Sequence, residues 1–159
     1  MHPNVERVVE SARRDGLEIA VERFPEGTRT AADAARAVGC DVAQIVKSLV
    51  FMADGAAVLA LVSGADRVDL ERLAAAAGAT SARRADGDEA RAATGYAIGG
   101  VPPFGHAGSV AILVDRRLMN QPRLWAAAGL PDAVFPVSPD ELLRVSGGRL
   151  ADLAEPARP

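Results

Sequence analysis

Several residue types on which common protein classes depend are scarce in this chain. One cysteine, Cys40, stands among 159 residues, so no disulfide can form within the chain, as is typical of proteins in a reducing compartment. The two histidines, His2 and His106, show no metal-ligand spacing with it. The longest strongly apolar run, residues 56–62, is too short to cross a bilayer, and the polar N-terminus does not resemble a signal peptide. We therefore expect a cytoplasmic protein with no membrane contact, metal or cofactor.

Positive charge and aromatic side chains are also limited. The formal net charge is −3 at pH 7, whereas a protein that coats DNA carries a broad basic surface, so we expect no DNA partner. Aromatic residues make up 4% of the chain, too few for recognition by serial base stacking. A local RNA contact stays open, because three arginine pairs could cluster in space; the alternative is that each is solvated surface charge. These pairs are Arg13-Arg14, Arg83-Arg84 and Arg116-Arg117.

Lysine is nearly missing, and its one occurrence is informative. Lys47 is the single lysine among eighteen Lys and Arg residues, and it lies in the most strand-like segment, residues 45–52. A compact ammonium with a tunable pKa is not interchangeable with a rigid, permanently charged guanidinium. We therefore interpret Lys47 as the candidate functional centre. The alternative is a strand lysine whose head group reaches water.

The clearest local structure in the sequence is a β-hairpin around this lysine. Two runs suited to strands, residues 45–53 and 56–63, flank Asp54-Gly55, which is a strong two-residue turn signal. The register that this turn implies places Lys47 opposite Val62. Because side chains alternate along a strand, Lys47 projects from an otherwise apolar face, where an ammonium loses hydration unless it reaches a pocket or a partner.

The rest of the pattern mixes helices and short strands without regular βαβ alternation, which predicts an α+β fold with a mixed, largely antiparallel sheet. We expect one domain over residues 1–153 and a flexible tail over 154–159. Helices are predicted over 4–14, 30–38, 86–94 and 138–145, residues 66–77 are expected to hold a loop followed by a helix, and a short turn is expected over 41–44. Besides the hairpin, strands are predicted over 17–24, 80–83, 109–114, 124–128 and 133–137 and near Leu150.

A glycine- and proline-rich loop, residues 95–106, is the second candidate feature. It is neither a dinucleotide fingerprint nor a Walker loop. The pair Gly99-Gly100 could let backbone N–H groups converge on an anion, as in an oxyanion hole, or the loop could be a rigid connector. His106, at the end of the loop, is either a general base or a residue that bonds only backbone.

These segments, in this order and spacing, resemble the YbaK-type aminoacyl-tRNA deacylase family. That family is an editing domain also found inserted in, or associated with, prolyl-tRNA synthetases. The matching segments are Asp33-Ala34-Ala35, Gln44-Ile45-Val46-Lys47-Ser48-Leu49-Val50-Phe51, Arg67-Val68-Asp69-Leu70, Gly95-Tyr96, Gly99-Gly100-Val101-Pro102-Pro103-Phe104-Gly105 and Gly148-Arg149-Leu150-Ala151-Asp152-Leu153.

The resemblance implies a barrel-like mixed sheet flanked by helices, and hydrolysis of the ester that joins a wrong amino acid to a tRNA 3′ end. It also implies that Lys47 is the functional lysine and that Gly99-Gly100 lies against the scissile carbonyl. The chain has Ala127 where the wider family often has a hydroxyl residue. It has Lys47-Ser48 where the alanine-specific subclass has Lys-Asn. The amino acid that is removed therefore stays open.

We expect a freestanding deacylase that edits mischarged tRNA in trans, with tRNA-Pro as the tRNA and prolyl-tRNA synthetase as a partner. The alternatives are a non-catalytic module that binds aminoacyl-tRNA or a synthetase, and a hydrolase of free aminoacyl esters. We expect catalytic roles for Lys47 and Gly100. Substrate contacts are expected from Phe24, Ser48, Gly99, Val101, Pro102, Phe104, Gly105 and His106.

Overall fold

The computed structural model describes residues 1–25, 28 and 30–156. Its helices are α1 (Pro3–Arg14), α2 (Ala31–Val38), α3 (Leu70–Ala77), α4 (Gly87–Thr94) and α5 (Pro139–Ser146), with short 3₁₀ turns η1 (Val42–Gln44) and η2 (Arg116–Asn120). Its strands are β1 (Glu22–Arg23), β2 (Val46–Ala53), β3 (Ala56–Ser63), β4 (Ala82–Arg84), β5 (Ala111–Asp115), β6 (Leu124–Ala127), β7 (Ala133–Val137) and β8 (Arg149–Ala151).

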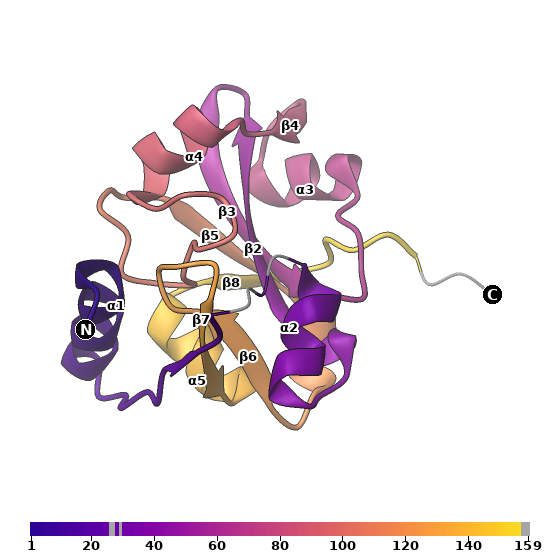
Figure 1. Ribbon diagram of the computed structural model, residues 1–159. Helices are drawn as coiled ribbons and strands as arrows, with labels where there is room; N and C mark the ends of the chain where they lie inside the picture. The colour runs from indigo at the N-terminus through magenta and orange to yellow at the C-terminus, as the bar shows by residue number, and fades with distance from the viewer. Residues whose placement is uncertain (26–27, 29, 157–159) are drawn as a thin grey trace.

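The strands form two sheets, which confirms the mixed α+β fold class. One sheet has the order β4-β2-β3-β5-β8 and the other β1-β7-β6. The pairings β3–β5 and β5–β8 are parallel, and the pairings β2–β3, β2–β4, β1–β7 and β6–β7 are antiparallel. A single parallel bridge between Ile45 and Trp125 brings the sheets together, and helices surround them (Figure 1).

The sheets do not close into a continuous barrel, and the reason lies in one short strand. β4 is three residues long and pairs only with Phe51–Ala53, the last part of β2. Among the described residues, the edge of β2 from Lys47 to Leu49 therefore carries no neighbouring strand on the β4 side and faces β6 of the other sheet. This open edge is where the candidate site lies.

The predicted hairpin is confirmed with its register. Lys47 pairs with Val62 in the β2–β3 ladder. The turn residues Asp54 and Gly55 both have positive φ, 48° and 83°, the conformation that a tight two-residue hairpin turn requires. The Asp54 carboxylate also accepts hydrogen bonds from the backbone N–H of Thr80 at 2.9 Å and of Ser81 at 3.2 Å, which ties the turn to the segment before β4.

The two faces of the hairpin pack against different helices. On one face Leu59 and Leu61 are buried in a core shared with α1, α4 and α5. On the other, Ala60 and Val62 pack in a separate cluster with Leu73 of α3. Alternation places Lys47 on this second face, so the prediction of a lysine projecting from an apolar face is confirmed.

Two predicted segments differ from the structure. Of the strand expected over residues 17–24, only β1 forms; Leu17 instead closes α1 through a backbone bond to Ala12. The expected tail begins at residue 154, but Ala154 is 2% exposed and bridges Val68, and the Glu155 N–H donates to the carbonyl of Arg67. The tail therefore does not include these two residues, and residues 157–159 lie outside those described.

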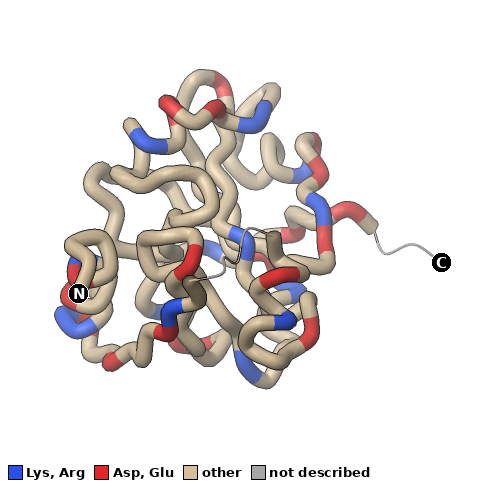
Figure 2. Tube along the Cα trace, in the orientation of Figure 1, with Lys and Arg blue, Asp and Glu red and all other residues tan. Residues whose placement is uncertain are grey.

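Charged residues of both signs are interspersed over the chain rather than segregated on one side (Figure 2). This distribution agrees with the low net charge and with the expectation of no broad basic surface. Within the described residues, no helix is both long and apolar enough to cross a bilayer.

The N-terminus of α4 offers a test of local stability. Asp86 caps the helix by accepting from the Glu89 N–H at 2.8 Å, and the Glu89 carboxylate accepts from Arg83 at 2.7 Å and from the Asp86 N–H at 3.0 Å. The Arg83 hydrogen bond, with that backbone bond, lowers the pKa of Glu89 from 4.5 to about 2. Because Arg83 adjoins Arg84 in β4, this arrangement also holds the strand that borders the site.

We expect Glu89→Gln to lower the stability of the protein at neutral pH and to lose this effect in acid. A carboxylate with a depressed folded-state pKa stabilises above its unfolded value, and the contribution disappears as pH falls from about 4.5 to about 2. The measurement is the urea midpoint of wild type and variant between pH 7 and pH 2. Glu71→Gln in α3, where no ion pair occurs among the described residues, is the control. A wild-type advantage that is unchanged at pH 2 would refute the assignment.

Candidate functional site

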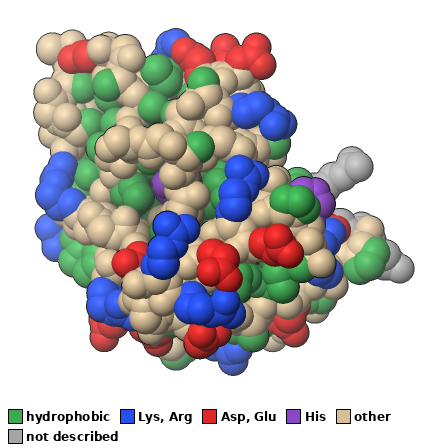
Figure 3. All heavy atoms as spheres, turned by 90° about the vertical axis from the view of Figure 1, so that its left-hand side faces the viewer, with side chains coloured by type: hydrophobic (Ala, Val, Ile, Leu, Met, Phe, Trp, Pro, Cys, Tyr) green, Lys and Arg blue, Asp and Glu red, His purple; other side chains and the backbone are tan. Residues whose placement is uncertain are grey.

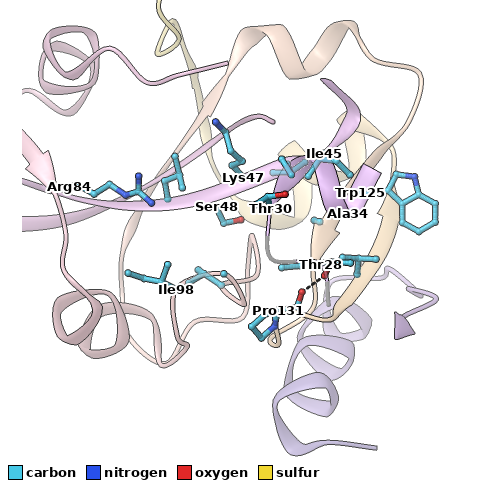
Figure 4. Close-up of a pocket in the computed structure, with 18 residues that line it drawn as sticks. Thr28, Thr30, Ala34, Ile45, Lys47, Ser48, Arg84, Ile98, Trp125 and Pro131 are labelled. Atoms are coloured by element: carbon cyan, nitrogen blue, oxygen red, sulfur yellow. Dashed lines mark hydrogen bonds between the residues drawn. The ribbon is translucent and has the colours of Figure 1, made fainter. Parts of the chain in front are cut away.

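A cavity of about 280 Å³ opens where the free edge of β2 faces the second sheet. Figure 4 shows its walls, which come from β2, the start of α2, the loop after α4, β4, and the β6–β7 region. The lining residues are Thr28, Thr30, Ala31, Ala34, Ile45, Val46, Lys47, Ser48, Leu49, Arg84, Ile98, Gly99, Val101, Trp125, Ala126, Ala127, Pro131 and Val134. The structure thus brings Lys47, Ser48, Gly99 and Val101 of the expected site together in one cavity.

Lys47 is half-buried at the rim of this cavity. Its ammonium donates a hydrogen bond to the backbone carbonyl of Asp66, in the loop after β3. Burial lowers the pKa of Lys47 below its ordinary value; the charge of Asp66 opposes this effect, while Arg84 and Arg67 add to it. Lys47 therefore retains two further N–H donors for a ligand and loses its proton more readily than an exposed lysine.

Ser48 points to the opposite side of β2 from Lys47 (Figure 4). Its hydroxyl is buried and has no hydrogen-bond partner among the described residues. A buried hydroxyl without a partner is unfavourable by about 1–3 kcal/mol, so this group is available to a ligand or an ordered water. Ser48 also borders a separate small pocket of about 10 Å³ between β2 and the loop after α4.

The loop after α4 contributes Gly99 but turns Gly100 away. The Gly99 N–H has no acceptor among the described residues, whereas the Gly100 N–H donates to the carbonyl of Ala97 at 3.0 Å. Gly100 is buried, and a Cβ on it would lie 3.0–3.1 Å from backbone atoms of Gly129 and Leu130. The Gly100 amide is therefore not free to face a substrate, and this glycine allows two backbone segments to pack closely.

Two cations and no acidic side chain line the cavity among the residues that the structure describes. The cations are Lys47 and Arg84, and the described lining holds no Asp, Glu or His. The Arg84 guanidinium lies 5.8 Å from the ring centre of Phe51, which holds it over the sheet. The described residues also contain no cluster of three side chains suited to a metal ion. The arrangement suits an anionic ligand and provides no carboxylate or imidazole base.

The other expected site residues lie outside the cavity. Phe24 packs behind its wall, against the cluster that contains Trp125. Pro102 and Phe104 are buried, and the Phe104 ring contacts that of Phe135 at a centroid distance of 5.7 Å. Phe24, Pro102 and Phe104 therefore do not line the cavity and would not contact a ligand bound in it.

Gly105 and His106 also lie outside the cavity and line a second one, on the α1 side of the molecule. The His106 Nε2 lies 2.7 Å from the Pro102 carbonyl. The imidazole is therefore hydrogen-bonded to the backbone, which is one of the two roles that the sequence left open. Burial lowers the pKa of His106, and the bond to Pro102 partly opposes this.

Most residues of the cavity wall could not be predicted from the sequence. Thr28, Thr30, Trp125 and Pro131 come from segments far apart in the chain, and no spacing connects them. The Thr28 hydroxyl donates to the Pro131 carbonyl, which joins two of these segments (Figure 4). Arg84 could be noticed in the sequence, because it belongs to one of the three arginine pairs. Its neighbour in that pair and both members of the 116–117 pair contact carboxylates instead.

Comparison with known proteins is consistent with this geometry. The sequence model of the aminoacyl-tRNA editing domain matches residues 25–145. A crystal structure of a candidate trans-editing enzyme for prolyl-tRNA synthetase superposes with a TM-score of 0.91 and 43% identity, over 98% of this chain and 99% of that one. The uncharacterized protein YwhH of Bacillus subtilis is 30% identical over 79% of this chain and 80% of its own length.

The proline–tRNA ligase of Acidithiobacillus ferrooxidans is 32% identical over 73% of this chain. The chain spans about a fifth of the length of that ligase, since the match covers 20% of it.

Proposed function

Because the chain belongs to the aminoacyl-tRNA editing domain family, we propose that it is a deacylase that hydrolyses the ester of a mischarged tRNA in trans. The observation that carries the proposal is the cavity at the free edge of β2. It combines the one lysine of the chain, a second cation and the backbone N–H of Gly99, which has no acceptor among the described residues, within about 280 Å³. This volume suits an aminoacyl group with part of the terminal ribose.

The cationic rim positions the terminal nucleotide. Lys47 and Arg84 attract its phosphate or hydrogen-bond its ribose. The aminoacyl group extends inward past Ser48 toward the apolar wall formed by Ile45 and Val101. Holding the ester in one orientation lowers the entropic part of the barrier.

The Gly99 N–H is the oxyanion donor in this proposal. Attack by water on the ester carbonyl places negative charge on its oxygen, and a preorganised donor there is worth about 3–4 kcal/mol of barrier. Gly99 has a φ of 92° and is exposed on the cavity side, so its amide is positioned by the loop itself. Gly100 supports this geometry by its close packing on Gly129 and is not itself the donor.

No acidic residue lines the cavity within the described part of the chain, so we consider other groups that could activate the water. Two groups can do so: the Lys47 amine, which deprotonates more readily than an exposed lysine, or a free hydroxyl of the terminal ribose. The two differ in their dependence on pH, because only the first requires loss of a proton from Lys47.

The relatives support prolyl-tRNA as the editing target. One is a proline–tRNA ligase that contains a segment similar to this chain, and another is a candidate trans-editing enzyme for prolyl-tRNA synthetase. We propose tRNA-Pro carrying a wrong amino acid as the substrate and prolyl-tRNA synthetase as a partner, in the cytoplasm. The small cavity limits the amino acid to a small side chain.

The test is a deacylation assay on a panel of tRNA-Pro species charged with different small amino acids. We expect one or a few species to be hydrolysed far faster than correctly charged tRNA-Pro. Free aminoacyl esters serve as the control, because a small-molecule hydrolase would cleave them equally well. Binding to charged tRNA without hydrolysis of any member would contradict the proposal and favour a non-catalytic module.

A further inference from the structure

A second cavity of about 300 Å³ lies on the far side of the loop after α4, against α1. Its lining consists of Arg7, Ser11, Arg14, Tyr96, Gly105, His106 and Ala107. Figure 3 views this side of the molecule and shows a histidine recessed in a hollow, with basic side chains beside it. The proposed deacylation uses none of these residues.

Helix periodicity and one glycine build this cavity. Arg7, Ser11 and Arg14 are spaced four and three residues apart, so they share one face of α1. Gly105 lets this face come close: a Cβ on it would lie 2.9 Å from the Cβ of Ser11. Its φ of 74° is in addition unfavourable for other residues. The backbone positions of Arg7 and Arg14 are thus about 10 Å apart along the helix axis, and both side chains line the cavity.

The positive charge of the cavity has no counterpart in the described residues. Neither Arg7 nor Arg14 contacts a carboxylate there, and no acidic residue lines the cavity. By contrast, Arg13 of the same helix contacts Glu10 at 2.7 Å and Glu18 at 3.0 Å. Arg7 is held by Asn4, at 2.5 Å, and over the Tyr96 ring, at 5.2 Å from its centre. It keeps further N–H donors for a ligand.

Polar groups complete the lining. The hydroxyl of Ser11 borders the cavity, and the Tyr96 hydroxyl lies near its edge, where it donates to the Gly105 carbonyl at 3.3 Å. The ionisable groups that share the cavity with His106 are Arg7, Arg14 and Tyr96. The Nε2 of His106 is occupied by Pro102, which leaves Nδ1 as the second ring nitrogen. A protonated His106 would add a third cation, and an anion in the cavity would favour that form.

We propose that this cavity binds a phosphate group, specifically a phosphodiester of the tRNA acceptor strand whose 3′ end occupies the first cavity. Two arginines with hydroxyl and imidazole groups are the chemistry that recognises phosphate oxygens. One loop joins the two sites: Val101 lines the first and Gly105 the second, and four residues span at most about 14 Å. A short single strand can therefore contact both. This inference rests on the proposed function.

The test compares Arg14→Gln with Arg13→Gln, neighbouring substitutions that remove the same charge from α1. The ligand is an RNA hairpin with a single-stranded 3′ end that carries no amino acid, so the assay measures binding without hydrolysis. We expect Arg14→Gln to weaken binding about tenfold and to reduce the slope of log affinity against log salt by about one. Arg13→Gln should change binding less than twofold, because the Arg13 guanidinium already forms ion pairs with Glu10 and Glu18. Urea unfolding confirms that both variants are folded.

NMR titration of His106 supplies a second readout, with His2 as internal reference. We expect the RNA to raise the pKa of His106, while the imidazole resonances of His2 do not respond to the RNA. The same titration is repeated with inorganic phosphate in place of RNA. If phosphate raises the pKa of His106 while Arg14→Gln and Arg13→Gln bind RNA equally well, the cavity binds free phosphate and the proposed RNA contact is wrong. If neither ligand affects His106 and the two variants bind alike, the cavity is no phosphate site.

These outcomes separate the inference from the proposed function. Arg14-dependent RNA binding without any deacylation would retain the phosphate site and reject the enzyme. Deacylation with identical RNA binding by the two variants would retain the enzyme and reject the site.

Discussion

Lys47→Met is expected to abolish most deacylation, with kcat/KM falling about 100-fold or more. Methionine keeps most of the length of the side chain and removes the ammonium from the cavity. The other cation among its described lining residues, Arg84, is exposed at the edge. The measurement is single-turnover hydrolysis of the best substrate from the tRNA-Pro panel. Arg67→Gln, a charge change near Lys47 but outside the cavity lining, is the control and should retain activity within a few-fold.

The same substitution should not destabilise the protein. Burial lowers the pKa of Lys47 in the folded state. Between that lowered value and the ordinary value of 10.5, the unfolded chain binds more protons than the folded one. Wild-type stability therefore rises with pH in this window, and at neutral pH the buried charge is unfavourable. We expect Lys47→Met to unfold at no lower temperature than wild type at pH 7, with any advantage shrinking as pH rises toward 10.5.

Activity and stability together decide the role of Lys47. Loss of activity in a variant at least as stable as wild type indicates a residue retained for function. Full activity of Lys47→Met would dismiss Lys47 from the mechanism, and a large loss of stability would show that the lysine is mainly structural. If the wild-type rate rises with pH through the lowered pKa of Lys47, its amine is the base; if the rate falls, the ammonium is the active form.

Gly129→Ala is expected to produce the largest loss of stability among single glycine substitutions near the site. Gly129 has a φ of 95°, and an added Cβ would lie 2.8 Å from the backbone oxygen of Asn4. The left-handed conformation is unfavourable for alanine by about 1–2 kcal/mol, and the overlap adds about 1–3 kcal/mol because backbone cannot rotate away. We expect the free energy of unfolding, from urea titration, to fall by about 3 kcal/mol or more.

Gly147→Ala separates these two effects. Gly147 has a φ of 66° and open space where its Cβ would be, so only the conformational term applies, about 1–2 kcal/mol. The difference between the variants measures the close approach of α1 to the β6–β7 turn, where the Asn4 side chain also donates to the Gly129 carbonyl at 3.1 Å. Equal losses in both variants would show that α1 moves aside freely.

Local rules were sufficient for the elements that surround the site. The Asp54-Gly55 turn and strand alternation determine both the register and the face of Lys47, because each depends on neighbouring residues alone. The ends of α2, α4 and α5 were predicted for the same reason: their N-caps are Thr30, Asp86 and Ser138, and each helix is followed by a left-handed glycine. For α3 only the C-terminal end, before the left-handed Gly78, was predicted.

Relations between distant segments could not be predicted in this way. Residues 17–24 alternate like a strand, yet most of them have no ladder partner within reach, since only Glu22 and Arg23 meet β7. The Gly99-Gly100 pair suggested two donors, but the Ala97 carbonyl takes one of them. Which glycine amide is free depends on φ values and on packing against Leu130, and composition contains no information on either.

The tryptophan in the cavity wall gives the protein an intrinsic optical probe. Trp125 is the only tryptophan of the chain, is 9% exposed, and has the Arg123 guanidinium 5.0 Å from its ring centre. Its emission therefore originates at the cavity and from nowhere else in the molecule. Occupancy of the cavity can be followed in real time by fluorescence on the unlabelled protein, and a rapid-mixing experiment can resolve entry of the substrate from the hydrolysis that follows.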